Sequence, residues 1–386
     1  MKLERIDSQP LRDKKVILQI ELPPRSHSLA GLYIAKITET IELLQERGAR
    51  TLLTGHSVFS PQTQDESFAG YQNDIAKIIG NDVPFFNAAE LKPAIAALKS
   101  QSLVFVDNLL HLPSEKQPSK HDVTTLAEGM DLYVTEAFTG LGESYASSTF
   151  LPAMLPSFLG MQLAHDLDLL QTLQSGKPSP TTFIMGGQNL AESLPVLRKM
   201  LSVTDNIILG GVLANTALKG NALQMGSSVV DRERLSEAFQ IVERARLEEC
   251  HVELPVDHII VDRISAKAKS KKTSGKEVAD GWIAVDVGPK SLSNYEKIIK
   301  KSGIVFMHGP LGASDVFEFQ QGTVKLLKYI AKQKIPLIIV GEDLSGIAIE
   351  ADISPTLVLP ESGTVFKLFR GQSLAGLQAI MASQAG

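Results

Sequence analysis

The segment MDLYVTEAFTGLGESYASS, residues 130–148, joins a predicted strand to residue types that could hold an anion. Leu132–Val134 are apolar and partly β-branched or aromatic, which predicts a strand, and the glycines and serines after them predict a loop. In an open parallel sheet, loops at the carboxyl ends of strands bind ligands, and a Gly/Ser loop there offers backbone N–H groups to an anion. However, Glu136 and Glu143 are the only charged residues of this loop, and both would repel an anion.

Length and composition restrict the classes of protein that the chain can belong to. Its 386 residues predict two domains, and 44% hydrophobic with 21% charged residues is typical of a soluble globular protein. The net charge is −5, and residues 1–176 hold 14 basic against 21 acidic residues, a poor match for nucleic acid or a polyphosphate. The single cysteine, Cys250, excludes an internal disulfide. With no apolar run long enough for a bilayer and no signal-peptide pattern at the start, we expect a cytoplasmic protein without a membrane partner.

Apolar runs alternate with amphipathic segments along the whole chain, which predicts an α/β protein with parallel sheets. We expect strands at 14–22, 49–56, 102–110, 131–138, 181–187, 205–212, 257–264, 302–310 and 335–343, and helices at 31–48, 157–175, 191–202 and 231–249. The break GKPSP at 176–180 predicts the domain junction. The basic segment 265–276 predicts a solvated loop, with contact to RNA or an acidic partner as the alternative.

A series of motifs then suggests a family. Eight stretches occur in an order and spacing that resemble phosphoglycerate kinase over nearly the whole length. They are TIELLQERGARTLLTGH, FVDNLLHLPSEKQ, LYVTEAFTGLGESYASS, FIMGGQNLAESL, IILGGVLANT, DGWIAVDVGPKS, VFMHGPLGASDVFEFQQGT and VFKLFRG. The resemblance implies two Rossmann-like, doubly wound domains: 1–160 for 3-phosphoglycerate and 179–370 for Mg-nucleotide. It further implies an interdomain helix and hinge at 161–178, a tail at 371–386 that returns to the first domain, and a monomer that carries out ATP:3-phosphoglycerate phosphotransfer in glycolysis.

The positions that match the family's 3-phosphoglycerate site have mostly lost its charged groups. The family's Arg-x-Asp-x-Asn becomes Gln19, Glu21 and Pro23, and its other basic positions fall on Tyr33, Ser60, Leu110, Gly142 and Glu143. Only His56 is retained. A glutamate roughly 4 Å from a substrate charge of the same sign would cost about 4 kcal/mol at an effective dielectric constant near 20. Glu143 is therefore expected to oppose phosphoglycerate.

The positions that match the nucleotide side keep their glycines and lose their lysines. Gly186 and Gly187 remain, but the two lysines that follow in the family become Asn189 and Ser193. Carboxylates enter two further loops as Glu342 and Glu361. The matching positions that could still support an adenosine pocket are Gly210, Gly211, Lys290, Pro310, Asp315, Gly341 and Asp343, with Asp343 as the candidate metal ligand through Mg-nucleotide.

These losses predict a phosphoglycerate kinase-like protein that has lost the reaction, requires no cofactor and acts as a non-catalytic binding or regulatory module. One alternative is a weakly active kinase that uses Mg-ATP or Mg-ADP, with Arg25 and Lys36 as repositioned cations. Another is a sensor that binds adenosine without phosphates. A new active site is unsupported, since no Ser-His-Asp set or metal-ligand spacing can be argued. The pattern predicts an adenine nucleotide as the small-molecule partner and does not identify a protein partner.

Overall fold

The computed structural model describes residues 3–59, 66–116, 120–176 and 178–385, without the side chains of 120–122. Contacts divide the chain into two units, 1–169 with 371–386, and 170–370. Each unit is built on a six-stranded parallel sheet, so the predicted α/β class is confirmed. The hinge role predicted for 161–178 stays a prediction.

The sheet of the first unit has the strand order β3-β4-β2-β1-β5-β6. Its strands are β1 (Lys15–Leu22), β2 (Arg50–Ser57), β3 (Phe85–Phe86), β4 (Leu103–Asn108), β5 (Leu132–Thr135) and β6 (Ser157–Leu159). Nearly every residue of β1, β2 and β4 is buried, as expected for strands covered on both faces. The chain runs outward in both directions from β1, which places a topological switch point between β1 and β5.

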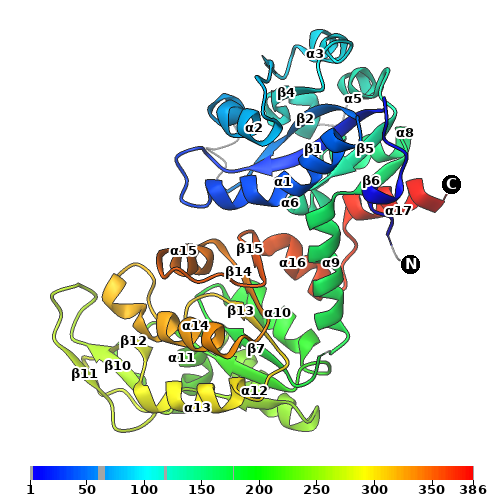
Figure 1. Ribbon diagram of the computed structural model, residues 1–386. Coiled ribbons are helices and arrows are strands. Elements are labelled where there is room, and N and C mark those ends of the chain that lie inside the picture. The colour runs from blue at the N-terminus through cyan, green and yellow to red at the C-terminus, as the bar shows by residue number, and fades with distance from the viewer. Residues whose placement is uncertain (1–2, 60–65, 117–119, 177, 386) are drawn as a thin grey trace. The chain divides into compact units, whose positions relative to one another are not determined.

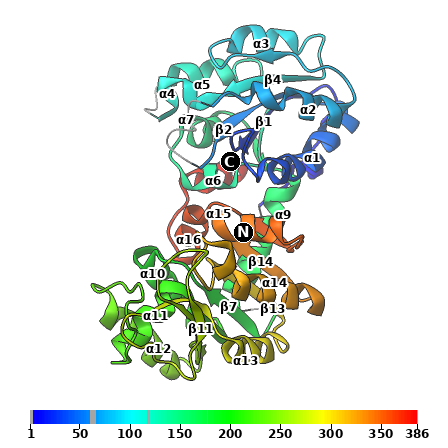
Figure 2. The same cartoon turned by 90° about the vertical axis from the view of Figure 1, so that its left-hand side faces the viewer.

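Helices cover both faces of this sheet (Figures 1 and 2). On one face lie α1 (Ala30–Glu46) and α2 (Gln72–Ile79), and on the other α3 (Leu91–Ala97) and α5 (Lys120–Ala127). Short helices α4 (Pro113–Lys116), α6 (Phe138–Gly142), α7 (Ala146–Thr149) and α8 (Leu151–Met154) follow the strand ends. After β6 comes α9 (Met161–Gln174), and the terminal helix α17 (Ala375–Ala385) packs on α6, α8 and β6.

The sheet of the second unit has the order β15-β14-β13-β7-β8-β9. Its strands are β7 (Thr181–Met185), β8 (Asn206–Leu209), β9 (His251–Glu253), β13 (Ile304–His308), β14 (Leu337–Val340) and β15 (Leu357–Leu359). One face is covered by α13 (Pro289–Ile299) and α14 (Gln321–Gln333), the other by α10 (Leu190–Met200), α11 (Gly211–Gly220) and α12 (Leu235–Leu247) (Figure 2). Two further helices are α15 (Glu342–Glu350) and α16 (Ser362–Phe369).

The structure corrects four local predictions. Residues 157–159 are a strand, not the start of a helix, and they pair with β5. The predicted loop after β5 contains the one-turn helices α6 and α7. The predicted strand 257–264 yields β10 (His258–Val261), which joins no parallel sheet but pairs antiparallel with β11 (Ser270–Lys272) and β12 (Ile283–Val287), beside the larger sheet in Figure 1. The basic segment 265–276 therefore contains an edge strand. Among the described residues, no helix is long and apolar enough to cross a membrane.

Candidate functional site

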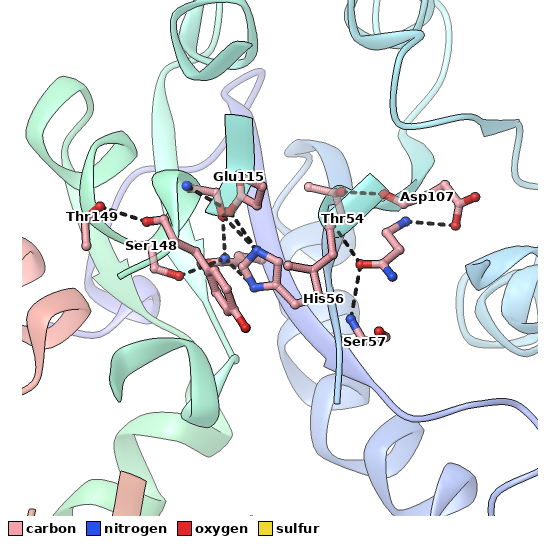
Figure 3. A network of polar contacts seen from close by, with 12 residues as sticks. Thr54, His56, Ser57, Asp107, Glu115, Ser148 and Thr149 are labelled. Carbon is pink, nitrogen blue, oxygen red and sulfur yellow. Dashed lines mark hydrogen bonds and ion pairs between the residues drawn. The ribbon is translucent and has the colours of Figure 1, made fainter. Parts of the chain in front are cut away.

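A buried polar cluster lies at the carboxyl end of β2 in the first unit, where Figure 3 shows His56 and Glu115 pointing toward each other. His56 donates from Nε2 to Glu115 Oε1 at 2.8 Å. The same oxygen accepts the hydroxyl of Ser147 at 2.6 Å and its backbone N–H at 3.1 Å. The three side chains come from β2, α4 and α7, and each residue is at most 3% exposed. The carboxylate is therefore satisfied by protein groups.

Gln19 of β1 completes this cluster. Its Nε2 lies 3.3 Å from His56 Nδ1, 2.8 Å from Ser147 Oγ and 3.2 Å from Ser148 Oγ, while the hydroxyl of Tyr133 donates to Gln19 Oε1. Both ring nitrogens of His56 thus have partners, which fixes the tautomer with the proton on Nε2. We call these six residues, Gln19, His56, Glu115, Tyr133, Ser147 and Ser148, the His56 cluster.

The His56 cluster contains a serine, a histidine and an acid, yet its geometry is not that of a nucleophilic triad. In such a triad the hydroxyl and the carboxylate bind opposite ring nitrogens, so that histidine can accept the hydroxyl proton. Here Ser147 Oγ lies 3.2 Å from Nε2, the nitrogen that also binds Glu115. Burial alone would raise the pKa of Glu115, but the hydrogen bonds from His56 and Ser147 outweigh it and hold that pKa below its usual value. The cluster therefore holds its polar groups in place and activates none of them.

The other positions predicted on the substrate side do not join this cluster. Glu21 is buried and accepts the backbone N–H of Thr139 at 2.8 Å. The Pro23 carbonyl accepts the hydroxyl of Tyr71 at 2.8 Å. Buried Tyr33 packs edge-on against Phe59, and Leu110 is half-buried in a short 3₁₀ turn. Glu143 is half-buried and ends α6, and Ser60 lies outside the described residues. Glu21, Pro23 and Tyr33 thus form contacts within the fold.

The two candidate repositioned cations also have partners. Lys36 Nζ lies 2.9 Å from Asp166 Oδ2, and this aspartate is 2% exposed. Arg25 Nε lies 3.0 Å from Asp74 Oδ2, and its guanidinium lies 5.3 Å from the ring centre of Tyr71. Binding a phosphate with either cation would require breaking an ion pair that the fold already forms.

The second unit holds a cavity of about 360 Å³ at the switch point of its sheet. The loops after β7, β8, β13 and β14 form its walls, and β12 closes one side. Of the nucleotide-side positions predicted from the sequence, the structure places these in the lining: Gly187, Asn189, Gly211, Pro310, Asp315, Gly341 and Asp343. Lys290 lies outside that lining, and its Nζ donates to the carbonyl of Ser274 at 3.2 Å.

Glycines allow the strand ends around this cavity to pack closely. A Cβ on Gly186 would lie 2.1 Å from the carbonyl oxygen of Pro310, and one on Gly210 would lie 2.5 Å from Leu311 Cδ2. Three glycines of the cavity lining use their backbone N–H groups within the fold. Gly187 donates to the carbonyl of Pro310, Gly211 to that of Leu311 and Gly341 to that of Leu359, at 2.9–3.0 Å. The loops therefore keep the shape of a ligand site, but these amides are not available to a phosphate.

The charge around this cavity is negative. Four carboxylate residues line it, Asp286, Asp315, Glu342 and Asp343, and none of the described lining residues is lysine or arginine. Burial raises the pKa of Asp286 to about 7, and its carboxylate accepts the backbone N–H groups of Gly322 and Val287. Glu361, next to the cavity, accepts the N–H of Gly363 at 3.1 Å and so occupies the N-terminus of α16. These groups oppose a bound polyphosphate.

The histidines of the cavity do not offset this charge at neutral pH. Burial lowers the pKa of His308 to about 4 and also lowers the pKa of His258. His258 lies 3.0 Å from the carbonyl oxygen of Lys276. The Nδ1 atom of His308 is buried and has no hydrogen-bond partner among the described residues, while its ring packs against Phe366.

Sequence reasoning found His56 and Gln19 through the matched motifs but missed Glu115, which binds His56. Glu115 stands 59 residues later in the chain, in a helix of one turn, and no local pattern links the two. The half-buried histidine His308 and the buried carboxylate Asp286 were likewise not identified as part of the cavity.

The fold and the cavity at the switch point define a two-unit α/β protein with a ligand site of the kind that Rossmann-like sheets form. A family model described as phosphoglycerate kinase matches residues 6–358, and the chain belongs to the phosphoglycerate kinase family. The phosphoglycerate kinase of Leptospira biflexa is 28% identical over 392 residues, 99% of each chain, and that of Pseudothermotoga lettingae is 26% identical over 349 residues, 88% of each.

Solved structures agree in fold. The phosphoglycerate kinase of Coxiella burnetii superposes with a TM-score of 0.86 at 23% identity, covering 98% of this chain and 99% of that one. That of Pyrococcus horikoshii gives a TM-score of 0.85 at 20% identity, covering 99% and 100%. These similarities show the two-domain fold of the family.

Proposed function

We propose that this member of the phosphoglycerate kinase family has lost phosphoryl transfer between ATP and 3-phosphoglycerate and acts as a non-catalytic binding module. One observation carries the proposal: the His56 cluster closes on itself at the strand ends where the family binds its substrate. In place of the basic group that matches Gln19, an amide bonds to His56, Ser147 and Ser148. Phosphoryl transfer depends on positioned cations, and here the side chains of Gln19 and Glu21 form structural hydrogen bonds instead.

Mg-nucleotide, which the family uses as substrate, does not fit the second unit's cavity well. The described lining has four carboxylates and no lysine or arginine, and the amides of Gly187, Gly211 and Gly341 are bonded to carbonyls. No group of three or more potential metal-ligating side chains occurs in the part of the chain that the structure describes. Asp343, the candidate ligand for a nucleotide-bound metal, binds Ser314 Oγ at 3.3 Å. The residues of this cavity therefore do not form a site for the phosphates and metal of Mg-nucleotide.

The alternative function, a weakly active kinase, requires basic side chains near the substrate side that are available to bind phosphate. Arg25 and Lys36 were the candidates, and each is bound to an aspartate. This pairing favours the non-catalytic proposal over the alternative.

Titration calorimetry with Mg-ATP and with 3-phosphoglycerate tests the proposal, together with a turnover assay on protein from a host strain depleted of its own phosphoglycerate kinase. We expect no turnover and no heat from 3-phosphoglycerate. Turnover that persists through purification would overturn the proposal. The triple variant Glu143→Arg, Asn189→Lys, Ser193→Lys controls for the source of any small rate, because a rate from the family's site should rise when its cations return.

A further inference from the structure

The basic segment 263–276 takes no part in the His56 cluster, and its lysines lie outside the lining of the second unit's cavity. The segment contains no acidic residue, and its five lysines are all exposed: Lys267, Lys269, Lys271, Lys272 and Lys276. Within the described chain, none of these five ammonium groups forms an ion pair, whereas Arg263 lies 3.4 Å from Asp262. The segment therefore concentrates positive charge on a chain whose net charge is −5.

The same segment forms the open edge of the small antiparallel sheet. In the strand order β11-β10-β12, β11 pairs with β10 on one side and with no described strand on the other (Figure 1). All three of its residues, Ser270–Lys272, are exposed. An edge strand presents a row of backbone N–H and C=O groups with which another extended chain can pair.

The backbone pairing shows which groups of β11 face outward. The N–H of Thr273 donates to the carbonyl of His258 at 2.9 Å, so Thr273 directs its backbone groups toward β10. Residues of an antiparallel strand alternate in the side to which they direct these groups. Lys271 therefore also faces β10, while the N–H and C=O groups of Ser270 and Lys272 point to the open side.

The strand next to this edge is packed on both faces. Ile260 of β10 belongs to an apolar cluster with Met225 and Val278, and its neighbour Val261 belongs to a second cluster with Val285 and Phe319. Because β11 pairs with a strand that is held from both sides, the sheet presents the open edge in a fixed direction.

The charge of this edge decides which strand can join it. Two copies of β11 side by side would place lysines opposite one another, and like charges directly across a strand pair are destabilising. Opposite charges at the same positions stabilise the pair. The lysines therefore exclude a second copy of this chain and favour a strand that carries carboxylates.

Two features of this surface favour a peptide over a nucleic acid. Proteins that bind single-stranded nucleic acids stack bases on aromatic rings, but Lys271 Nζ lies 3.7 Å from the ring centre of Trp282, the single tryptophan. In addition, the outward N–H and C=O groups of Ser270 and Lys272 match those of an extended peptide.

We propose that β11 binds an extended acidic segment of a partner protein as an additional strand, with the carboxylates of that segment at the lysines of 267–276. The inference goes beyond the proposed function, because it concerns a different surface and does not depend on the loss of phosphoryl transfer.

Calorimetry on the full-length protein at pH 7 and low salt tests the inference with four probes. The first is an end-blocked peptide of alternating glutamate and threonine. Two analogues carry N-methyl groups on backbone nitrogens, one at every glutamate and the other at every threonine, and the fourth probe is oligouridylate RNA. We expect the parent peptide to bind, and to bind more weakly as the salt concentration rises.

The two methylated analogues separate strand pairing from charge attraction alone. They have the same charge, but alternate residues of a strand direct their N–H groups to opposite edges, so only one analogue loses the donors that face β11. We expect that analogue to bind at least about tenfold more weakly than the parent peptide and the other to stay within about twofold.

Charge-neutral variants locate the binding surface. The double variant Lys269→Gln, Lys272→Gln should bind the parent peptide at least about threefold more weakly, since it removes two exposed ion pairs. The matched control is Lys300→Gln, Lys301→Gln, which removes two exposed lysines directly after α13 in the same unit. This control should leave the affinity within about twofold.

Five outcomes would overturn the inference. They are no binding of the parent peptide, equal affinities of the two methylated analogues, tighter binding of oligouridylate than of the peptide, equal losses in the two double variants, and a dimer in sedimentation that the peptide dissociates. The last outcome would assign the edge to a second copy of the chain. None of these measurements involves turnover, so each leaves the proposed loss of phosphoryl transfer standing.

Discussion

The carboxylate of Glu136 accepts the backbone N–H of Leu163 at 2.7 Å, which ties the end of β5 to the first turn of α9. Glu136 also accepts the N–H of Gln162 at 3.2 Å and the hydroxyl of Thr40 in α1. A Cβ at position 160 would lie 2.1 Å from this carboxylate, so Gly160 leaves the space that the contact needs. One of the two acids that made the sequence of this region unusual therefore caps a helix inside the fold.

This environment predicts a pH-dependent stability. Burial raises the pKa of Glu136 to about 7, from 4.5. The folded state therefore keeps a proton that the unfolded state releases above pH 4.5, and the contribution of this group to stability is lost as the pH rises to 7. The shift corresponds to about 3 kcal/mol.

The variant Glu136→Gln cannot ionise and should lack this loss. Urea denaturation at pH 5 and pH 8, followed by circular dichroism, measures the free energy of unfolding of both proteins. We expect the variant to lose about 2.5 kcal/mol less than the original chain between these two pH values, because part of the loss has already occurred at pH 5. Asp286, whose pKa is also raised to about 7, is present in both proteins and cancels in the comparison. Equal losses in the two proteins would contradict the prediction.

Removing Glu115 should strongly destabilise the first unit. In Glu115→Ala, His56 Nε2 and the hydroxyl of Ser147 lose their shared acceptor inside a closed cluster, and each buried donor left without a partner costs about 1–3 kcal/mol. Glu46→Ala, at an exposed position of α1, is the matched control and should change the free energy of unfolding by less than about 0.5 kcal/mol. A loss below about 1 kcal/mol for Glu115→Ala would mean that the cluster does not hold these segments together.

Local patterns in the sequence predicted the central strands well, since β1, β4 and β13 each contain a run of three or four consecutive buried apolar residues. They failed where local and long-range preferences differ. The three residues of β6 carry too little signal to separate them from α9, and pairing with β5 decides their conformation. The direction of β10 within its small sheet is likewise set by its partners β11 and β12, which no window of sequence contains.

The same limit applies to the candidate sites. Comparison with the family's motifs showed that Gln19 stands where the family has an arginine. It could not show that the amide would bond to His56, Ser147 and Ser148, because these bonds need the sheet order that brings β1, β2 and α7 together. The acidic lining of the second unit's cavity was predicted in part, as Asp315, Glu342 and Asp343. The neutral state of His308 depends on burial and could not be predicted from the sequence.

Restoring the family's arginine at position 19 should destabilise the protein. Gln19→Arg would place a guanidinium with five donors in a position that is 1% exposed, beside hydroxyl groups that already have partners. We expect a loss of about 3 kcal/mol or more in the free energy of unfolding. Leu110→Arg, which restores a matched arginine at a half-buried position, should cost about 1 kcal/mol or less, because its stem can lie on the surface. Similar costs for the two variants would show that the His56 cluster tolerates a charge.

Gly211 should be essential to the cavity of the second unit. Its φ is +57°, and a Cβ there would lie 2.9 Å from the backbone N and O atoms of Gly187. In Gly211→Ala, this contact and the left-handed backbone together should cost about 2–4 kcal/mol and open the packing between the strand ends. Trp282, the single tryptophan, lies in the same unit, so the fluorescence of this residue reports its unfolding directly.

The matched control is Gly346→Ala in α15, where a Cβ would meet no atom within 4 Å. Alanine inside a helix should stabilise this unit by about 0.5–1 kcal/mol, since it restricts the unfolded chain more than glycine does. The two substitutions add the same methyl group to the same unit, so opposite signs in the Trp282 unfolding curve would assign the difference to position 211. If both stabilise the unit, the close approach of the β7 and β8 loops does not require glycine, and the cavity walls are more adaptable than their bonded amides indicate.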